Sequence, residues 1–223
     1  MSIKEFVKDL SSLDHSKSTQ EKFRDFCELG YCAYARLTTS MDKADELEKR
    51  YMQIVSTYSD KDAIRAYPRL LGMVWQGVEQ DKEDFLGVAA TEIGALNASQ
   101  GQFFTPIEIS QLMAQITLND AGTLIKEKGY ITFNEPASGS GGMILAVANT
   151  LEKMGFDPAN HMLVCAQDIS QICYHMCFLQ LVFRGIPALV ERRNTLSMEL
   201  FESAWTPAAI KFSKEHRRIF SEN

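Results

Sequence analysis

The sequence predicts an α/β fold: a truncated, mainly parallel sheet preceded by an all-helical N-terminal region. Up to about residue 98, apolar residues recur at helical spacing and no strand pattern interrupts them. After that point, short apolar runs alternate with amphipathic helical segments, which is typical of βαβ units with parallel strands. We therefore expect two domains, a helical one over 1–98 and a sheet-containing one over 99–223.

The N-terminal region reads as four or five helices. One of them begins at Ser18, because Glu21 follows three residues later and the pair forms a capping box. Apolar residues at helical spacing continue from Leu47 to Tyr58, and the segments "RLLGMVWQGV" and "EDFLGVAATEIGAL" have the same character.

The C-terminal region begins after the polar link "NASQG". Its strand candidates are 130–135, 161–168 and 186–191, and helices are expected between them at about 141–154 and 169–183. After about residue 204 we expect only one helix, "PAAIKFSKEHRRIF". The predicted sheet therefore ends after its third strand, which leaves an apolar edge to be covered by the N-terminal helices, the last helix or a second subunit.

Composition excludes several classes of protein. The formal net charge of -6 argues against an independent, nonspecific binder of nucleic acid, because such proteins are usually basic. No apolar run is long enough for a membrane span, and the charged N-terminus does not resemble a secretory signal. The five cysteines lack the spacing of a disulfide framework, so we expect reduced thiols and a cytoplasmic protein without a membrane partner.

The stretch "FNEPASGSGGM" (133–143) follows the first strand candidate and indicates a ligand site. Glycines at a strand-to-helix turn let a ligand approach the backbone, and the amides that open the next helix can receive a carboxylate or phosphate. Asp168 closes the second strand, where a carboxylate can accept hydrogen bonds from a ribose. The alternative from these residues alone is an ordinary glycine-rich turn beside a surface aspartate.

The stretch "GQFFTPIEISQLM" (101–113) predicts a well-capped helix. Thr105 is expected as the N-cap, Pro106 as the first helical residue and Glu108 as part of a capping box. Four apolar residues at helical spacing are expected to form its buried face: Ile109, Leu112, Met113 and Ile116.

The order of these motifs resembles a known family. "GQFFTP", then "EPASGSGGM", then the strand-end acid in "AQDIS", then "RRNTLSMELF" is similar to the N6-adenine DNA methyltransferases that serve as modification subunits of type I restriction systems. The resemblance covers roughly residues 83–203. It implies a Rossmann-like methyltransferase sheet, S-adenosylmethionine as the cofactor and adenine in DNA as the methyl acceptor.

The resemblance also implies which residues bind the cofactor. The loop against its methionine end matches Phe103, Phe104, Thr105 and Pro106. The glycine loop around the methionine carboxylate and amine matches Glu135, Pro136, Ala137, Gly139, Ser140 and Gly141. The nucleoside end matches Asp168 for the ribose, and Ile169 and Asn194 beside the adenine. Two positions depart from the family pattern: Glu135 replaces the common Asp, and Arg193 replaces the glycine that usually precedes the "NTL" motif.

The motif that carries catalysis in this family is absent. Its members hold a flipped adenine with an Asp/Asn-Pro-Pro-Tyr/Phe segment after the fourth strand. None of the six prolines of this chain is followed by another, and we find no sequence for strands four to seven of the family sheet. The catalytic residues are therefore unknown.

Three hypotheses remain from the sequence. The first is methylation of DNA adenine, by an unusual catalytic segment or with the missing half supplied by another chain. The second is a noncatalytic methyltransferase-like protein that regulates or decoys restriction-modification machinery, and the third is a structural domain whose glycine loop binds nothing. The partners implied are DNA, alone or with a partner subunit, a second copy of the chain, or restriction-modification subunits. Cys173 and Cys177 share a helix face, which would suit a pair of metal ligands. However, His175 points elsewhere on that helix and no second pair exists, so no metal is expected and buried thiols are the better explanation.

Overall fold

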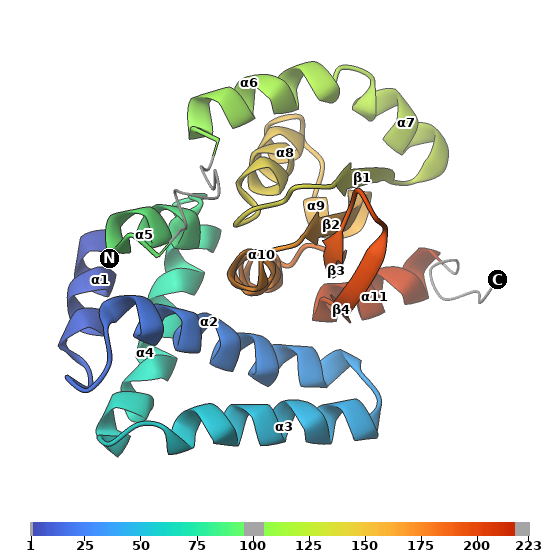
Figure 1. The fold of residues 1–223 in the computed structure, drawn as a ribbon. Helices are drawn as coiled ribbons and strands as arrows, with labels where there is room; N and C mark the ends of the chain where they lie inside the picture. Colours follow the sequence, from blue (N-terminus) through green and yellow to red (C-terminus); the bar gives the residue numbers. More distant parts are fainter. Residues whose placement is uncertain (1, 96–104, 217–223) are drawn as a thin grey trace.

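Helices form the N-terminal part of the structure, as the sequence predicts (Figure 1). The computed structural model describes residues 2–95 and 105–216. The helices of the first range are α1 (Ile3–Ser12), α2 (Thr19–Ala35), α3 (Met41–Ser56), α4 (Lys61–Glu79) and α5 (Phe85–Ile93), with a short 3-10 turn η1 (Arg36–Thr38). The predicted capping box is confirmed, because the Ser18 side chain accepts from the Glu21 amide while the Glu21 side chain accepts from the Ser18 amide.

A four-stranded sheet forms the centre of the C-terminal part. Its order is β1 (Ile131–Glu135), β2 (Met162–Asp168), β3 (Ala188–Asn194) and β4 (Glu199–Trp205). β1, β2 and β3 are parallel, so the three predicted strands and the mainly parallel α/β fold are confirmed. The helices of this part are α6 (Ile107–Thr117), α7 (Ala121–Lys128), α8 (Gly142–Lys153), α9 (Pro158–His161), α10 (Gln171–Phe183) and α11 (Pro207–His216).

The expectation that the sheet ends after its third strand is wrong. β4 pairs antiparallel with β3, with Arg192 opposite Glu202 and a bulge between Arg192 and Arg193. The sequence of this strand, "ELFESAW", has no apolar run of the kind that marks a buried strand. Its apolar residues Leu200 and Phe201 are 48% and 45% exposed. The pairing with β3 is therefore what defines it, and the helix expected after it begins at Pro207.

The expected orientation of α6 is also wrong. Ser110 and Ala114 are its buried residues, and the helix packs on α8. The four apolar residues expected on its buried face are exposed instead, from 47% at Ile109 to 68% at Ile116. Small side chains at a contact allow helices to approach closely, so the serine and alanine face meets α8. The helix begins at Ile107 with Pro106 in the N-cap position, one residue later than expected, and no side chain caps it.

The two parts of the chain share one hydrophobic core. Tyr31 on α2 lies between three rings of α10: its ring centroid is 5.0 Å from Tyr174, 4.8 Å from His175 and 5.1 Å from Phe178. Of the three covers considered for the sheet-containing region, the N-terminal helices therefore provide one, through the packing of α2 on α10. The predicted boundary between 98 and 99 lies outside the described residues and stays a prediction.

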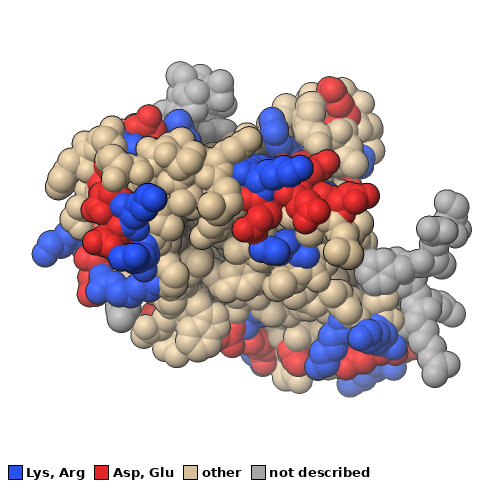
Figure 2. All heavy atoms as spheres, turned by 90° about the horizontal axis from the view of Figure 1, so that it is seen from below, with Lys and Arg blue, Asp and Glu red and all other residues tan. Residues whose placement is uncertain are grey.

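Charged residues of both signs are interspersed on the surface. On the face shown in Figure 2, the lysines and arginines lie in small groups among aspartates and glutamates, and no broad basic area appears there. Across the described ranges, no helix is both long and apolar enough to span a membrane.

Candidate functional site

A cavity of about 280 Å³ lies at the carboxyl end of β1, where parallel sheets commonly bind ligands. The glycine turn after β1 forms one wall, and the start of α6 and the loop before α5 form the others. Its lining residues are Asp84, Thr105, Ser110, Met113, Glu135, Ala137, Ser138, Gly139, Ser140, Gly142 and Met143. The structure therefore gathers Thr105 with four predicted residues of the glycine turn around one cavity.

Two glycines of this turn meet a strict geometric demand. Gly141 has a φ of +100°, and a Cβ there would lie 3.3 Å from the Cys177 sulfur. A Cβ on Gly142 would lie 2.8 Å from a carboxylate oxygen of Asp84. A side chain at Gly141 would be strained by this φ, and one at Gly142 would displace the Asp84 carboxylate.

The N-terminus of α8 is open toward an anion. Gly141 occupies its N-cap position, and no side chain caps the helix. The first amides of a helix lack partners within the helix, and they carry the positive end of its dipole. This turn therefore suits a ligand with a carboxylate or phosphate, and the bare glycines leave room for it.

Asp168 ties the end of β2 to the glycine turn. One of its carboxylate oxygens accepts from the Gly139 amide at 2.9 Å, and the other accepts from the Ser170 amide at 2.8 Å. Burial raises the pKa of this carboxyl, while the two amides partly offset that effect. Asp168 lies outside the lining of the cavity, but a carboxylate oxygen can accept a second hydrogen bond, so it can still bind a hydroxyl of a ligand beside the turn.

The remaining predicted residues lie in different surroundings. Pro136 and Ile169 are exposed beside the turn and outside the lining of the cavity. The Asn194 side chain accepts from the Leu196 and Ser197 amides and so shapes the turn between β3 and β4. Phe103 and Phe104 lie outside the described residues.

Asp84 is a lining residue that the sequence analysis missed. It precedes α5 and caps that helix, because its side chain accepts from the Gly87 amide at 3.0 Å. Its other oxygen accepts from the Ser140 hydroxyl at 2.6 Å. An aspartate before the "FLG" segment is a visible N-cap signal. Its contact with residue 140 depends on the fold and has no local signal.

A larger cavity of about 690 Å³ lies elsewhere, between α7, β1 and the end of α11. Tyr130, Ile131 and Thr132, from the amino end of β1, line it, so it is at the opposite end of this strand from the glycine turn. It contains no predicted site residue, and the smaller cavity is therefore the candidate site.

Comparisons with known proteins concern the family and the fold of the chain. The family described as N-6 DNA methylase matches residues 83–212, a range that contains Asp84, the glycine turn and Asp168. A solved structure from Listeria monocytogenes, provisionally described as a class I S-adenosylmethionine-dependent methyltransferase, has a similar fold with a TM-score of 0.52. Its identity is 11%, and the match covers 96% of this chain and 69% of that chain. A search of curated proteins finds no match.

Proposed function

Because the chain belongs to the N-6 DNA methylase family, whose implied cofactor is S-adenosylmethionine, we propose that it binds this cofactor at the glycine turn after β1 for methyl transfer to adenine in DNA. The observation that carries the proposal is the uncapped N-terminus of α8 beside two glycines where a side chain would be strained or would displace Asp84. The methionine end of the cofactor offers a carboxylate to these amides.

The chain's own residues have distinct roles in this proposal. The α8 amides bind the methionine carboxylate, and Thr105 and Glu135 line the same cavity. Asp168 holds the Gly139 amide and accepts from the ribose hydroxyls. When bound, the cofactor supplies an activated methyl group.

Methylation of DNA needs more than this site. The chain is acidic overall and has no Pro-Pro dipeptide to hold a flipped adenine. In the described sheet β1 is an edge strand, so further strands can add beside the glycine turn. We therefore propose that a partner subunit completes the adenine site and contributes DNA contacts, in the cytoplasm and as part of restriction-modification machinery.

Calorimetric titration with S-adenosylmethionine tests the cofactor site. We expect saturable binding by the wild type and a roughly 10- to 100-fold loss in Asp168→Ala, because a charged hydrogen-bond acceptor is removed. Asp157→Ala is the matched control: Asp157 caps α9 through the Ala159 amide, and its carboxylate bonds to Asn160, whereas that of Asp168 bonds to the glycine turn. Absence of binding by the folded wild type, or equal losses in the two variants, would contradict the proposal.

A noncatalytic regulator of restriction-modification machinery is the second candidate function. The observation that favours it is the missing Asp/Asn-Pro-Pro-Tyr/Phe segment, since cofactor binding does not need that motif. Transfer of radiolabelled methyl groups to unmethylated DNA, with and without the methyltransferase subunits of a complete system, separates the two. Methyl transfer that this chain supports, alone or in the mixture, and that Asp168→Ala reduces would favour the enzyme over the regulator. Cofactor binding without any transfer that depends on this chain supports the regulator.

A further inference from the structure

Two aspartates form hydrogen bonds with the glycine turn, and one of them belongs to the N-terminal half of the chain. Asp168 holds the Gly139 amide from β2. Asp84 lies 56 residues before Ser140 in the sequence and accepts from the Ser140 hydroxyl at 2.6 Å. Ser140 is 1% exposed, so this hydroxyl bonds within the protein interior.

Gln180 of α10 joins the same cluster and is fully buried. Its side-chain nitrogen donates to Asp84 at 2.8 Å and to the Ser140 carbonyl at 2.7 Å. Its side-chain oxygen accepts from the Leu86 amide at 3.1 Å. The Gln180 amide group thus connects α10 to α5 and to the glycine turn, and it also donates to Asp84.

The carboxyl group of Asp84 is held by hydrogen bonds and not by an ion pair within the described residues. Within residues 2–95 and 105–216, no lysine or arginine forms an ion pair with it. Burial raises the pKa of this carboxyl, and the bonds from Ser140, Gln180 and Gly87 oppose that effect. Burial of a carboxyl group costs free energy that its hydrogen bonds must offset, and a fully bonded buried network of this kind holds its members in a fixed arrangement.

The position of Asp84 relates it to the ligand cavity. It lines the 280 Å³ cavity and also an adjoining apolar cavity of about 260 Å³ between α5 and α6. Its carboxylate fills the space where a Cβ of Gly142 would lie. It therefore contacts the first turn of α8, whose amides receive the anion in the proposed function.

We propose that Asp84 is a positioning residue, which orders the glycine turn and the start of α8 for cofactor binding through Ser140 and Gln180. The link to the cofactor rests on the proposed function. The ordering of the turn by Asp84 does not depend on the proposed function, so it can be measured in the protein without cofactor. The helical region before α5 then contributes to the site by fixing its shape.

Substitution at Asp84 distinguishes positioning from a direct ionic contact with the cofactor. Asp84→Ala removes the acceptor of three hydrogen bonds, and we expect about tenfold or more loss of affinity for S-adenosylmethionine. Asp84→Asn keeps an oxygen for Gly87 and Gln180, and its amide can donate to the Ser140 oxygen, so we expect affinity within about threefold of the wild type. An Asn variant as weak as the Ala variant would overturn the proposal, because the charge rather than the geometry would then matter.

Hydrogen exchange of the turn provides a readout that needs no cofactor. We expect the amides of 138–145 to exchange about tenfold faster in Asp84→Ala than in the wild type or in Asp84→Asn. Asp60→Ala is the matched control, because Asp60 also caps a helix, α4, through the Asp62 amide. We expect this control to lower stability but to leave exchange of the turn through local opening unchanged. Unchanged exchange in Asp84→Ala overturns the proposal, whereas a wild type that binds no cofactor overturns the proposed function only.

A double-mutant cycle tests whether Asp84 acts through Ser140. If the two residues form one unit, Asp84→Ala combined with Ser140→Ala accelerates exchange no more than Asp84→Ala alone, within about threefold. If the two accelerations multiply, the residues act independently and the proposal is wrong. Circular dichroism confirms that each variant is folded.

Discussion

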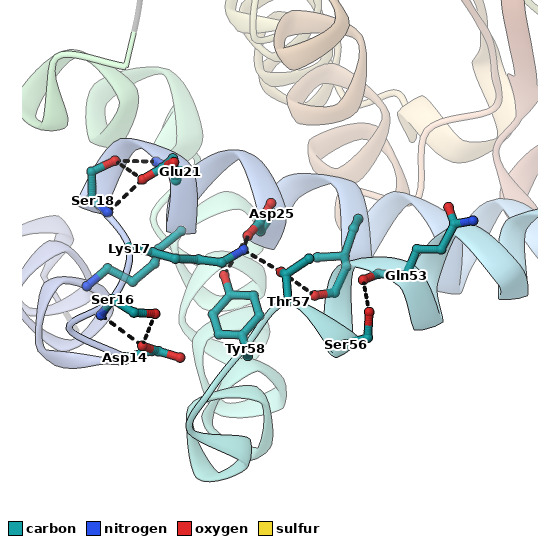
Figure 3. A network of polar contacts seen from close by, with 12 residues as sticks. Asp14, Ser16, Lys17, Ser18, Glu21, Asp25, Gln53, Ser56, Thr57 and Tyr58 are labelled. Carbon is teal, nitrogen blue, oxygen red and sulfur yellow. Dashed lines mark hydrogen bonds and ion pairs between the residues drawn. The ribbon is translucent and has the colours of Figure 1, made fainter.

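Asp14 connects two loops of the helical region, which are distant in sequence. It lies between α1 and α2, where it accepts from the amide and the hydroxyl of Ser16 (Figure 3). It also accepts from the amides of Ser59 and Asp60, which lie between α3 and α4. Lys17 extends the link, because its ammonium donates to Asp25 on α2 and to Thr57 after α3. These contacts fix the packing of four helices through one short loop.

The hydrogen bonds around Asp14 predict a specific dependence of stability on pH. The Ser16 hydroxyl, followed by the Asp60 amide, holds the pKa of this carboxyl well below its usual range. A carboxyl with a lowered pKa in the folded state stabilises the protein above its unfolded pKa of about 3.9, and this contribution is lost as the pH falls. Urea unfolding from pH 7 to pH 2 should therefore show that Asp14→Asn is less stable than the wild type at pH 7 and that the difference shrinks below about pH 4. A difference that stays constant over this range would contradict the assignment.

The burial pattern of α6 predicts that a glutamate destabilises the protein on one face of the helix and has little effect on the other. Ala114 is fully buried against α8, whereas Ile116 is 68% exposed. We expect Ala114→Glu to cost several kcal/mol of stability, because a carboxylate would be buried without a partner. We expect Ile116→Glu to change stability by no more than about 0.5 kcal/mol. Chemical denaturation of both variants measures this, and a large loss in Ile116→Glu would mean that the apolar face is covered.

Helices and parallel strands were predictable from the sequence, because each depends on a local pattern. The capping box at Ser18 and the strands before the glycine turn and Asp168 are examples. Periodicity shows which residues share a face of a helix but not which face meets a neighbour, so the orientation of α6 was wrong. β4 depends on pairing with β3 and exposes Leu200 and Phe201, so no apolar run marks it.

The candidate site was predictable where one turn forms it. The glycine motif and Asp168 lie at consecutive strand ends, and a parallel sheet brings such ends together. Asp84 and Gln180 could not be assigned, because they reach Ser140 only after α5 and α10 pack around the turn. Contacts between distant segments thus complete a site that a local motif begins.

The shared core of the whole molecule predicts that both parts unfold together. Tyr31 of α2 donates to Glu202 of β4 at 2.8 Å and accepts from Tyr174 of α10 at 2.8 Å. Arg50 of α3 pairs with the same Glu202 at 3.0 Å. Separate unfolding of either part would break these bonds and leave the buried Tyr31 and Tyr174 hydroxyls without these partners, at about 1–3 kcal/mol for each neutral group.

The two tryptophans of the chain allow this prediction to be measured, because Trp75 lies on α4 and Trp205 ends β4. Trp75→Phe leaves Trp205 as the fluorescent reporter of the sheet-containing part. Trp205→Phe leaves Trp75 as the reporter of the helical part. In both variants we expect urea transitions by fluorescence and by circular dichroism to coincide. Adding Tyr31→Phe should lower both midpoints together, since the hydrogen bond to Glu202 is lost while the ring remains. If only the Trp205 signal shifted, the contact between α2 and β4 would stabilise the sheet alone, and the two parts would be separate folding units.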